Sequence, residues 1–256
     1  PASMLARIDN LDNTIGDRKS EFEALRKVLY ADEVSDFLKE VDEALCSGVS
    51  LDWDVVSKAA YLNYYRIYYE SGESKEAQED KAEDCILRAL LMNPQHGDLT
   101  ARYADVLWRQ ECYLDAVSTL ERLMTSTEAP AFVQQWLGYY LLFVPNREDD
   151  VIKLSEDYHK RFPDESDTYF NIACAYAQKY KRELKERNAI ELPESENREK
   201  ALDNLRKALE FQPDFAKTVK EEWVKPAGSF YSLAKDKEFL KLVEQAISDS
   251  ESDADK

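Results

Sequence analysis

Side chains that could perform acid–base or nucleophilic chemistry are few in this sequence and lie far apart. The two histidines, His96 and His159, are widely separated, and neither has a local serine, cysteine or aspartate arrangement of the kind that nucleophilic catalysis uses. The sequence has no glycine-rich phosphate loop and no HExxH motif. Paired carboxylates such as Asp149 and Asp150 are typical of a solvated helix start in a chain this acidic. We therefore expect a protein that is not an enzyme and that needs no cofactor.

Metal binding is also disfavoured, because the four cysteines form no CxxC pair and have no histidine close enough in sequence to suggest a zinc site. We expect them to be reduced and mostly buried thiols. These cysteines are Cys46, Cys85, Cys112 and Cys174. No apolar run approaches the roughly 18 residues needed to span a bilayer, and no signal peptide precedes Met4. A cytoplasmic location without membrane contact is the expectation.

The chain is strongly acidic, since 34 Lys and Arg stand against 52 Asp and Glu and give a net charge of −18. Such a charge opposes general binding to nucleic acids and to anionic membranes. One local exception is the segment "KYKRELKER", with the cations Lys179, Lys181, Arg182, Lys185 and Arg187. It could meet an acidic partner. The favoured interpretation is a longer exposed helix with pairs such as Arg182 with Glu186 and Glu183 with Arg187.

The composition and the spacing of apolar residues predict an all-α protein. Glycine and proline are scarce, at six and eight, which favours helices. Apolar residues at helical spacing predict one kinked helix or two short ones from Leu5 to Leu29, and further helices from Asp32 to Leu45 and from Asp52 to Tyr69. No segment has the period-two alternation of a strand.

A repeated pattern organises the middle of the chain. The offsets of four, three and five residues that separate Ala201, Leu205, Ala208 and Pro213 also separate Ala82, Ile86, Ala89 and Pro94. Another copy begins at Ala116, with its proline displaced to Pro130, and a weaker copy begins at Val151. Each copy follows a second helical segment with its own small residue, which closely approaching helices require. Self-similarity at this period predicts stacked helical hairpins.

With these motifs the sequence resembles the tetratricopeptide repeat family, whose units of about 34 residues pair two antiparallel helices. The resemblance is weaker in the third copy, and Tyr65 replaces the small residue of the first. It implies an α–α superhelix with repeats at 51–97, 98–130, 131–165 and 166–215. The flanking parts are an N-terminal helical extension at 4–48, a C-terminal helical cap at 216–248 and a disordered acidic tail at 249–256.

The resemblance also implies a concave partner-binding groove lined by the first helix of each unit. Family positions near the small residue, and aromatic residues one turn further on, give the candidate set: Asn63, Arg66, Arg102, Asp105, Trp136, Tyr139, Asn171, Cys174, Tyr69, Trp108 and Phe143. Amides and guanidinium groups can bind a peptide backbone or a carboxylate, and aromatic residues can anchor apolar side chains. Many of them could equally belong to the core between repeats. The family's clamp for chaperone tails is not supported, since Leu62, Arg66 and Phe132 stand where it needs other residues.

The functional hypothesis is a non-catalytic scaffold that binds a protein or peptide in this groove. One alternative is a regulatory or sensor subunit of an enzyme or effector complex. A weaker one is single-stranded nucleic-acid binding through aromatic residues with Arg66, Arg102 and Arg109. The N-terminal helices are a candidate surface for regulating access or for homodimerisation.

Overall fold

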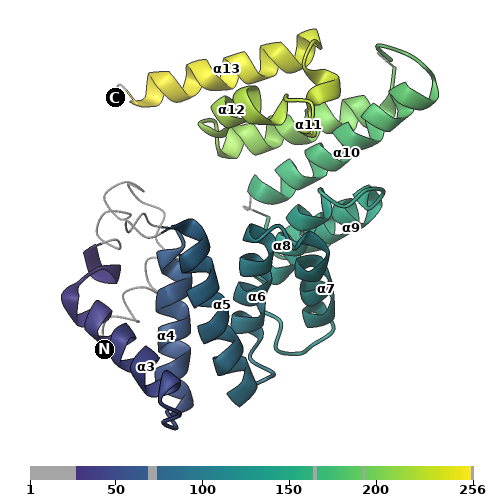
Figure 1. The fold of residues 1–256 in the computed structure, drawn as a ribbon. Coiled ribbons are helices and arrows are strands. Elements are labelled where there is room, and N and C mark those ends of the chain that lie inside the picture. Colours follow the sequence, from purple (N-terminus) through teal and green to yellow (C-terminus); the bar gives the residue numbers. More distant parts are fainter. Residues whose placement is uncertain (1–26, 69–73, 164–165, 193, 255–256) are drawn as a thin grey trace. The chain divides into compact units, whose positions relative to one another are not determined.

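The computed structural model describes residues 27–68, 74–163, 166–192 and 194–254, and its ordered elements are helices (Figure 1). No strand occurs within these ranges, so the all-α prediction is confirmed. Within the same ranges no helix is both long and apolar enough to cross a membrane. The chain divides into two compact units, residues 1–129 and 130–256, which are described separately below.

In its described residues the first unit contains two helical hairpins, preceded by helix α3 and by the last turn of another helix at 27–29. The elements are α3 (Asp32–Cys46), α4 (Trp53–Arg66), α5 (Lys75–Met92), α6 (Gly97–Arg109) and α7 (Tyr113–Met124). Helix α4 packs on α5, α6 packs on α7, and α5 also packs on α6. Ala82 and Ala89 are fully buried where these helices meet, as their small size predicts. Side chains also fix helix starts, because the Oγ of Ser74 and the Nδ1 of His96 accept backbone N–H groups of α5 and α6.

The described part of the N-terminal extension covers one side of α4. Leu29, Val34, Leu38 and Val41 form a buried cluster with the α4 residues Ala59 and Leu62. This cluster is separate from the one formed by α4, α5 and α6. Helix α4 is therefore enclosed on two sides. The predicted helix from Leu5 lies outside the described residues except for its last turn.

The second unit contains two further hairpins followed by a short irregular segment and a long helix. Its elements are α8 (Phe132–Leu141), α9 (Glu148–His159), α10 (Ser166–Glu186), α11 (Glu196–Phe211), α12 (Phe215–Thr218), a π-helical turn η1 (Val219–Trp223), a 3-10 turn η2 (Tyr231–Leu233) and α13 (Lys237–Ala254). Helices α8 and α9 pack together, as do α9 with α10 and α10 with α11. A Cβ on Gly138 would make ordinary van der Waals contacts, 3.4 Å from the Oγ of Ser155 and 3.6 Å from the Nδ2 of Asn171, so a small residue at this position is closely surrounded by α9 and α10.

Of two helix ends in the second unit, one agrees with the sequence prediction and one differs from it. Helix α10 continues through the first half of the inserted segment to Glu186, as the favoured interpretation of a longer exposed helix predicts, because residues 179–186 contain no proline or glycine. Helix α13 continues to Ala254, whereas a disordered tail was expected from residue 249. The side chain of Gln245 donates a 2.8 Å hydrogen bond to Asp249 one turn later, and no helix-breaking residue intervenes.

The C-terminal segment is fixed by an ion pair that also begins α13. Arg198 of α11 donates from Nε and Nη2 to the two carboxylate oxygens of Asp236, at 2.6 and 3.0 Å. Asp236 Oδ1 accepts the backbone N–H groups of Glu238 and Phe239 at 2.9 and 3.1 Å. These contacts hold the pKa of Asp236 below its usual range, although burial alone would raise it.

Candidate partner-binding surfaces

The predicted groove residues divide between the two units. Those in the first are Asn63, Arg66, Arg102, Asp105 and Trp108, and those in the second are Trp136, Tyr139, Phe143, Asn171 and Cys174. Tyr69 lies outside the described residues. Each unit therefore has its own candidate surface.

Arg66 and Asn63 make contacts within the first unit. The Nε and Nη2 of Arg66 donate to the carbonyl oxygen of Leu29 at 3.0 and 2.7 Å, and its guanidinium lies 4.9 Å from the ring centre of Tyr30. The amide of Asn63 donates to the thiol sulfur of Cys85 at 3.2 Å. Burial raises the pKa of that thiol to about 11. Arg66 therefore binds the backbone of the N-terminal extension. The sequence prediction had placed this side chain in the partner-binding groove.

Asp105 is the centre of a network between α4 and α6. Its Oδ2 accepts hydrogen bonds from the hydroxyl groups of Tyr64 and Tyr68, at 3.0 and 2.6 Å, and from the Nε of Arg109 at 3.0 Å. Asp105 is only 8% exposed, so these donors replace the water that its carboxylate loses on folding. The predicted groove residue Asp105 is therefore a structural anchor.

Two arginines of α6 are stacked on tyrosines of α4 and of the turn that follows it. The guanidinium of Arg102 lies 5.0 Å from the ring centre of Tyr64 and 5.6 Å from that of Tyr65. The guanidinium of Arg109 lies 4.0 Å from the ring centre of Tyr68. Stacking and ion pairing leave these side chains little freedom. We call this set the tyrosine–arginine wall, formed by Tyr64, Tyr65, Tyr68, Arg102, Asp105 and Arg109.

The wall reaches the surface at one end. Tyr68 is 40% exposed, and the side chain of Arg109 is 24% exposed. Trp108, on the same helix, packs on Tyr113 with 4.7 Å between ring centres. The sequence prediction included Arg102, Asp105 and Trp108 but did not assign Tyr64, Tyr68 or Arg109 to the groove. The tyrosine-rich run "NYYRIYYE" was the available signal.

The phenol groups of the wall predict a loss of stability at alkaline pH. Burial, and then the Asp105 charge, raise the pKa of Tyr68 to about 12, and the same two causes raise the pKa of Tyr64. An unfolded tyrosine titrates near pH 10, so the unfolded chain loses these protons first. The stabilising contribution is complete below about pH 10 and falls as the pH rises towards about 12. Urea midpoints measured across this range should decline less steeply for Tyr68→Phe than for the wild type or Tyr113→Phe.

The second unit places its predicted residues in different environments. Asn171 is 2% exposed beside Gly138, so its amide belongs to the interior and does not face a groove. Cys174 is fully buried, and that burial raises the pKa of its thiol. These two placements correct the prediction, because close helix approach and the C-terminal segment cover this side of α10. Trp136 packs on Phe132 with 4.8 Å between ring centres.

Tyr139 and Phe143 belong to a partly exposed aromatic cluster. Their ring centres are 5.4 Å apart, and the ring centre of Trp223 lies 6.4 Å from Tyr139 and 6.3 Å from Phe143. Trp223 also contacts the buried Phe170 at 5.0 Å, edge to face. Phe143 is 51% exposed. We call Tyr139, Phe143 and Trp223 the aromatic clamp; the sequence prediction had assigned Trp223 only to the cap.

Three of the five cations of the predicted basic patch are paired with carboxylates. Lys179 pairs with Asp149 at 2.6 Å, and Arg182 pairs with Glu148 at 2.5 Å. Of the two pairs expected along this segment, Arg187 does meet Glu183, at 3.0 Å, whereas Arg182 pairs with Glu148 of α9 instead of Glu186. Lys181 and Lys185 have no carboxylate partner among the described residues, and both are exposed. The Nζ of Lys181 donates to the carbonyl oxygen of Pro226 at 3.2 Å.

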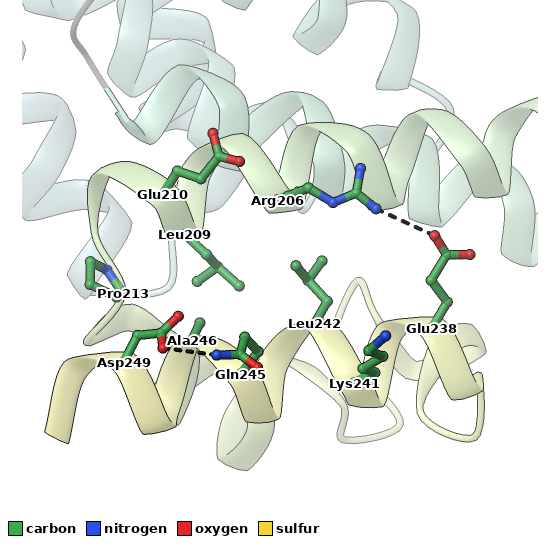
Figure 2. A pocket seen from close by; sticks show the side chains of 10 residues that line it. All are labelled: Arg206, Leu209, Glu210, Pro213, Glu238, Lys241, Leu242, Gln245, Ala246 and Asp249. Carbon is green, nitrogen blue, oxygen red and sulfur yellow. Dashed lines mark hydrogen bonds and ion pairs between the residues drawn. The ribbon is translucent and has the colours of Figure 1, made fainter. Parts of the chain in front are cut away.

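A shallow groove that the sequence did not predict lies between α11 and α13, with a volume of about 420 Å³ (Figure 2). Leu209 and Leu242 point into it from opposite helices. At one end Arg206 pairs with Glu238 at 3.3 Å. Its walls carry charges of both signs, so the groove itself favours no particular charge on a ligand.

Comparisons with known proteins give similarities in structure only. No family model matches the sequence, and no curated protein matches it. The crystal structure of MamA aligns with a TM-score of 0.49 at 14% identity, over 71% of this chain and 94% of that one. The structure of YrrB, described as a TPR protein with an unusual peptide-binding site, aligns with a TM-score of 0.44 at 21% identity, over 78% of this chain and 95% of that one. The human IFIT1 dimer with m7Gppp-AAAA aligns with a TM-score of 0.42 at 11% identity, over 97% of this chain and 63% of that one.

The arrangement of helices is consistent with the repeats read from the sequence. The described helices form the hairpins α4–α5, α6–α7, α8–α9 and α10–α11, and fully or nearly fully buried alanines lie at the predicted small positions of the first and last. The chain is therefore an all-α protein built from tetratricopeptide-like helical hairpins.

Proposed function

We propose that this chain is a non-catalytic scaffold that binds a protein or peptide partner on the first helices of its hairpins. The observation that carries the proposal is the tyrosine–arginine wall, where charged and aromatic side chains are already fixed before any partner arrives. Arginine and tyrosine are among the residue types most enriched at the energetic hot spots of protein interfaces.

The chemistry of the wall suits a peptide. Arg109 is held by Asp105 at 3.0 Å and stacked on Tyr68, so its guanidinium presents donors in a fixed direction. Such donors can bind a carbonyl or carboxylate group, and the exposed face of Tyr68 can cover an adjacent apolar side chain. Because these groups are ordered by the fold, association does not include the entropic cost of ordering them.

Affinity purification with a wall variant tests the proposal. Proteins captured from a lysate of the source organism by the wild-type chain should be lost with Arg109→Gln and retained with the control Arg122→Gln, which removes an exposed arginine from α7. Circular dichroism should first establish that both variants keep the wild-type helix content. A captured set that is identical for all three proteins would show that the wall does not bind the partner.

A further inference from the structure

We propose that the aromatic clamp and the basic side of α10 next to it form a second binding surface, for an acidic partner segment that carries one large apolar side chain. This surface lies wholly in the second unit and does not include the tyrosine–arginine wall. It therefore goes beyond the proposed function and can be tested separately.

The clamp is held in place by the C-terminal segment. The backbone N–H of Phe230 donates to the carbonyl oxygen of Trp223 at 3.0 Å, and Phe230 is fully buried. The amide of Gln178 donates to the carbonyl oxygen of Leu142 at 2.9 Å and to the hydroxyl of Ser229 at 2.8 Å. These bonds join the end of α8, the middle of α10 and the C-terminal segment, so the exposed Phe143 and the partly buried Trp223 lie on a fixed support.

An exposed phenylalanine beside a fixed tryptophan is a site for an apolar side chain. Phe143 is 51% exposed although its ring is in contact with two other aromatic rings. Large aromatic side chains lose little rotational freedom on binding and bury much apolar area, which is why they dominate interface energetics. A leucine or phenylalanine of a partner would shield Phe143 from water.

The charge of the partner follows from the helix face next to the clamp. Residues 181, 182 and 185 follow residue 178 by three, four and seven positions and therefore share one side of α10 with it. Gln178 is joined to the clamp by its hydrogen bonds to the carbonyl oxygen of Leu142, which precedes Phe143, and to the hydroxyl of Ser229. The others are Lys181, Arg182 and Lys185, so this side of the helix holds cations and no carboxylate of its own.

Ion pairs neutralise only part of this side. Arg182 is paired with Glu148, but Lys181 donates to a backbone carbonyl and lies 5.4 Å from the ring centre of Tyr231, neither of which carries charge. Lys185 is exposed without a carboxylate partner in the described part of the chain. On η1, Glu222 is paired with Lys225, and Glu221 is exposed. The unpaired cations of α10 can therefore form ion pairs with carboxylates of an acidic partner segment.

The test uses short fluorescein-labelled peptides and the full chain. The first peptide alternates Glu and Asp around a central Phe, the second replaces the acidic residues by Lys, and the third replaces the Phe by Ala. Fluorescence anisotropy at low salt should show binding of the first and at least ~10-fold weaker binding of the other two, and added salt should weaken the first.

Variants then locate the site. Phe143→Ala should weaken binding of the acidic peptide by ~10-fold, and Lys185→Glu by several-fold, while the matched controls Ile190→Ala and Lys153→Glu leave it unchanged. Ile190 is 95% exposed on the loop after α10, and Lys153 is exposed on α9. Absence of binding, equal binding of the basic peptide, or full binding by Phe143→Ala would overturn the proposal. Arg109→Gln should not change binding of the acidic peptide. If this proposal fails, the proposed role of the tyrosine–arginine wall therefore still stands.

Discussion

Replacement of Asp105 by alanine is expected to lower the free energy of unfolding by about 3 kcal/mol, because three buried or partly buried donors then lose their common acceptor. The hydroxyl of Tyr64, the hydroxyl of Tyr68 and the Nε of Arg109 all donate to one oxygen of this carboxylate. Tyr64 is 1% exposed, so water cannot replace the missing acceptor without rearrangement of α4 and α6. Arg109 would also keep its charge without its paired carboxylate.

Urea unfolding followed by circular dichroism measures this loss. Asp80→Ala is the matched control, since Asp80 is an exposed aspartate of α5 without a partner in the described chain, and it should change stability by less than about 0.5 kcal/mol. The double variant with Tyr64→Phe should be less destabilised than the sum of the two single variants, because one unsatisfied hydroxyl is then absent. Equal stability of Asp105→Ala and Asp80→Ala would contradict the central role of Asp105.

The hairpins could be predicted because their signal is local and repeated. Ala82, Ala89, Ala201 and Ala208 are at most 3% exposed, at helix crossings where a larger side chain would hold the helices apart. The same spacing was visible without any structure. Helix ends were less predictable, as α13 shows, because a solvent-exposed continuation needs only residues that tolerate a helix.

The candidate surfaces were only partly predictable because they depend on contacts between distant segments. Tyr64 and Asp105 are 41 positions apart, and their hydrogen bond requires a particular register of α4 on α6. Arg66 has the residue type and position of a groove side chain, yet it holds the backbone of Leu29. Nothing periodic in the sequence could have shown that an N-terminal segment would reach it.

Trp223 gives the clearest case of a functional candidate that repeat logic missed. It follows the last hairpin, and a capping role was the natural interpretation of its apolar side chain. It does pack on the buried Phe170, but it also extends the surface of Tyr139 and Phe143. Its position depends on a π-helical turn and on the loop that follows, neither of which has a strong sequence pattern.

That loop leads to the second large expected effect, a loss of up to about 3 kcal/mol of stability in Gly228→Ala. A Cβ at this position would lie 2.1 Å from the carbonyl oxygen of Trp223 and 2.5 Å from its carbonyl carbon. Both are backbone atoms, so no side-chain rotation can relieve the overlap. The loop must move, and this movement would weaken the 3.0 Å hydrogen bond from the N–H of Phe230 to the Trp223 carbonyl oxygen.

The substitution should lower both the stability of the protein and the affinity of the aromatic clamp for the peptide. Gly228→Ala should unfold at lower urea than the wild type and bind the acidic peptide more weakly, because Trp223 no longer supports Phe143. Ala227→Ser, an exposed change one position earlier in the same loop, should affect neither measurement. If Gly228→Ala lost stability but kept full peptide binding, Phe143 would bind without Trp223. Wild-type behaviour in both measurements would mean that the loop can shift freely, so the fixed support inferred for the clamp would be absent.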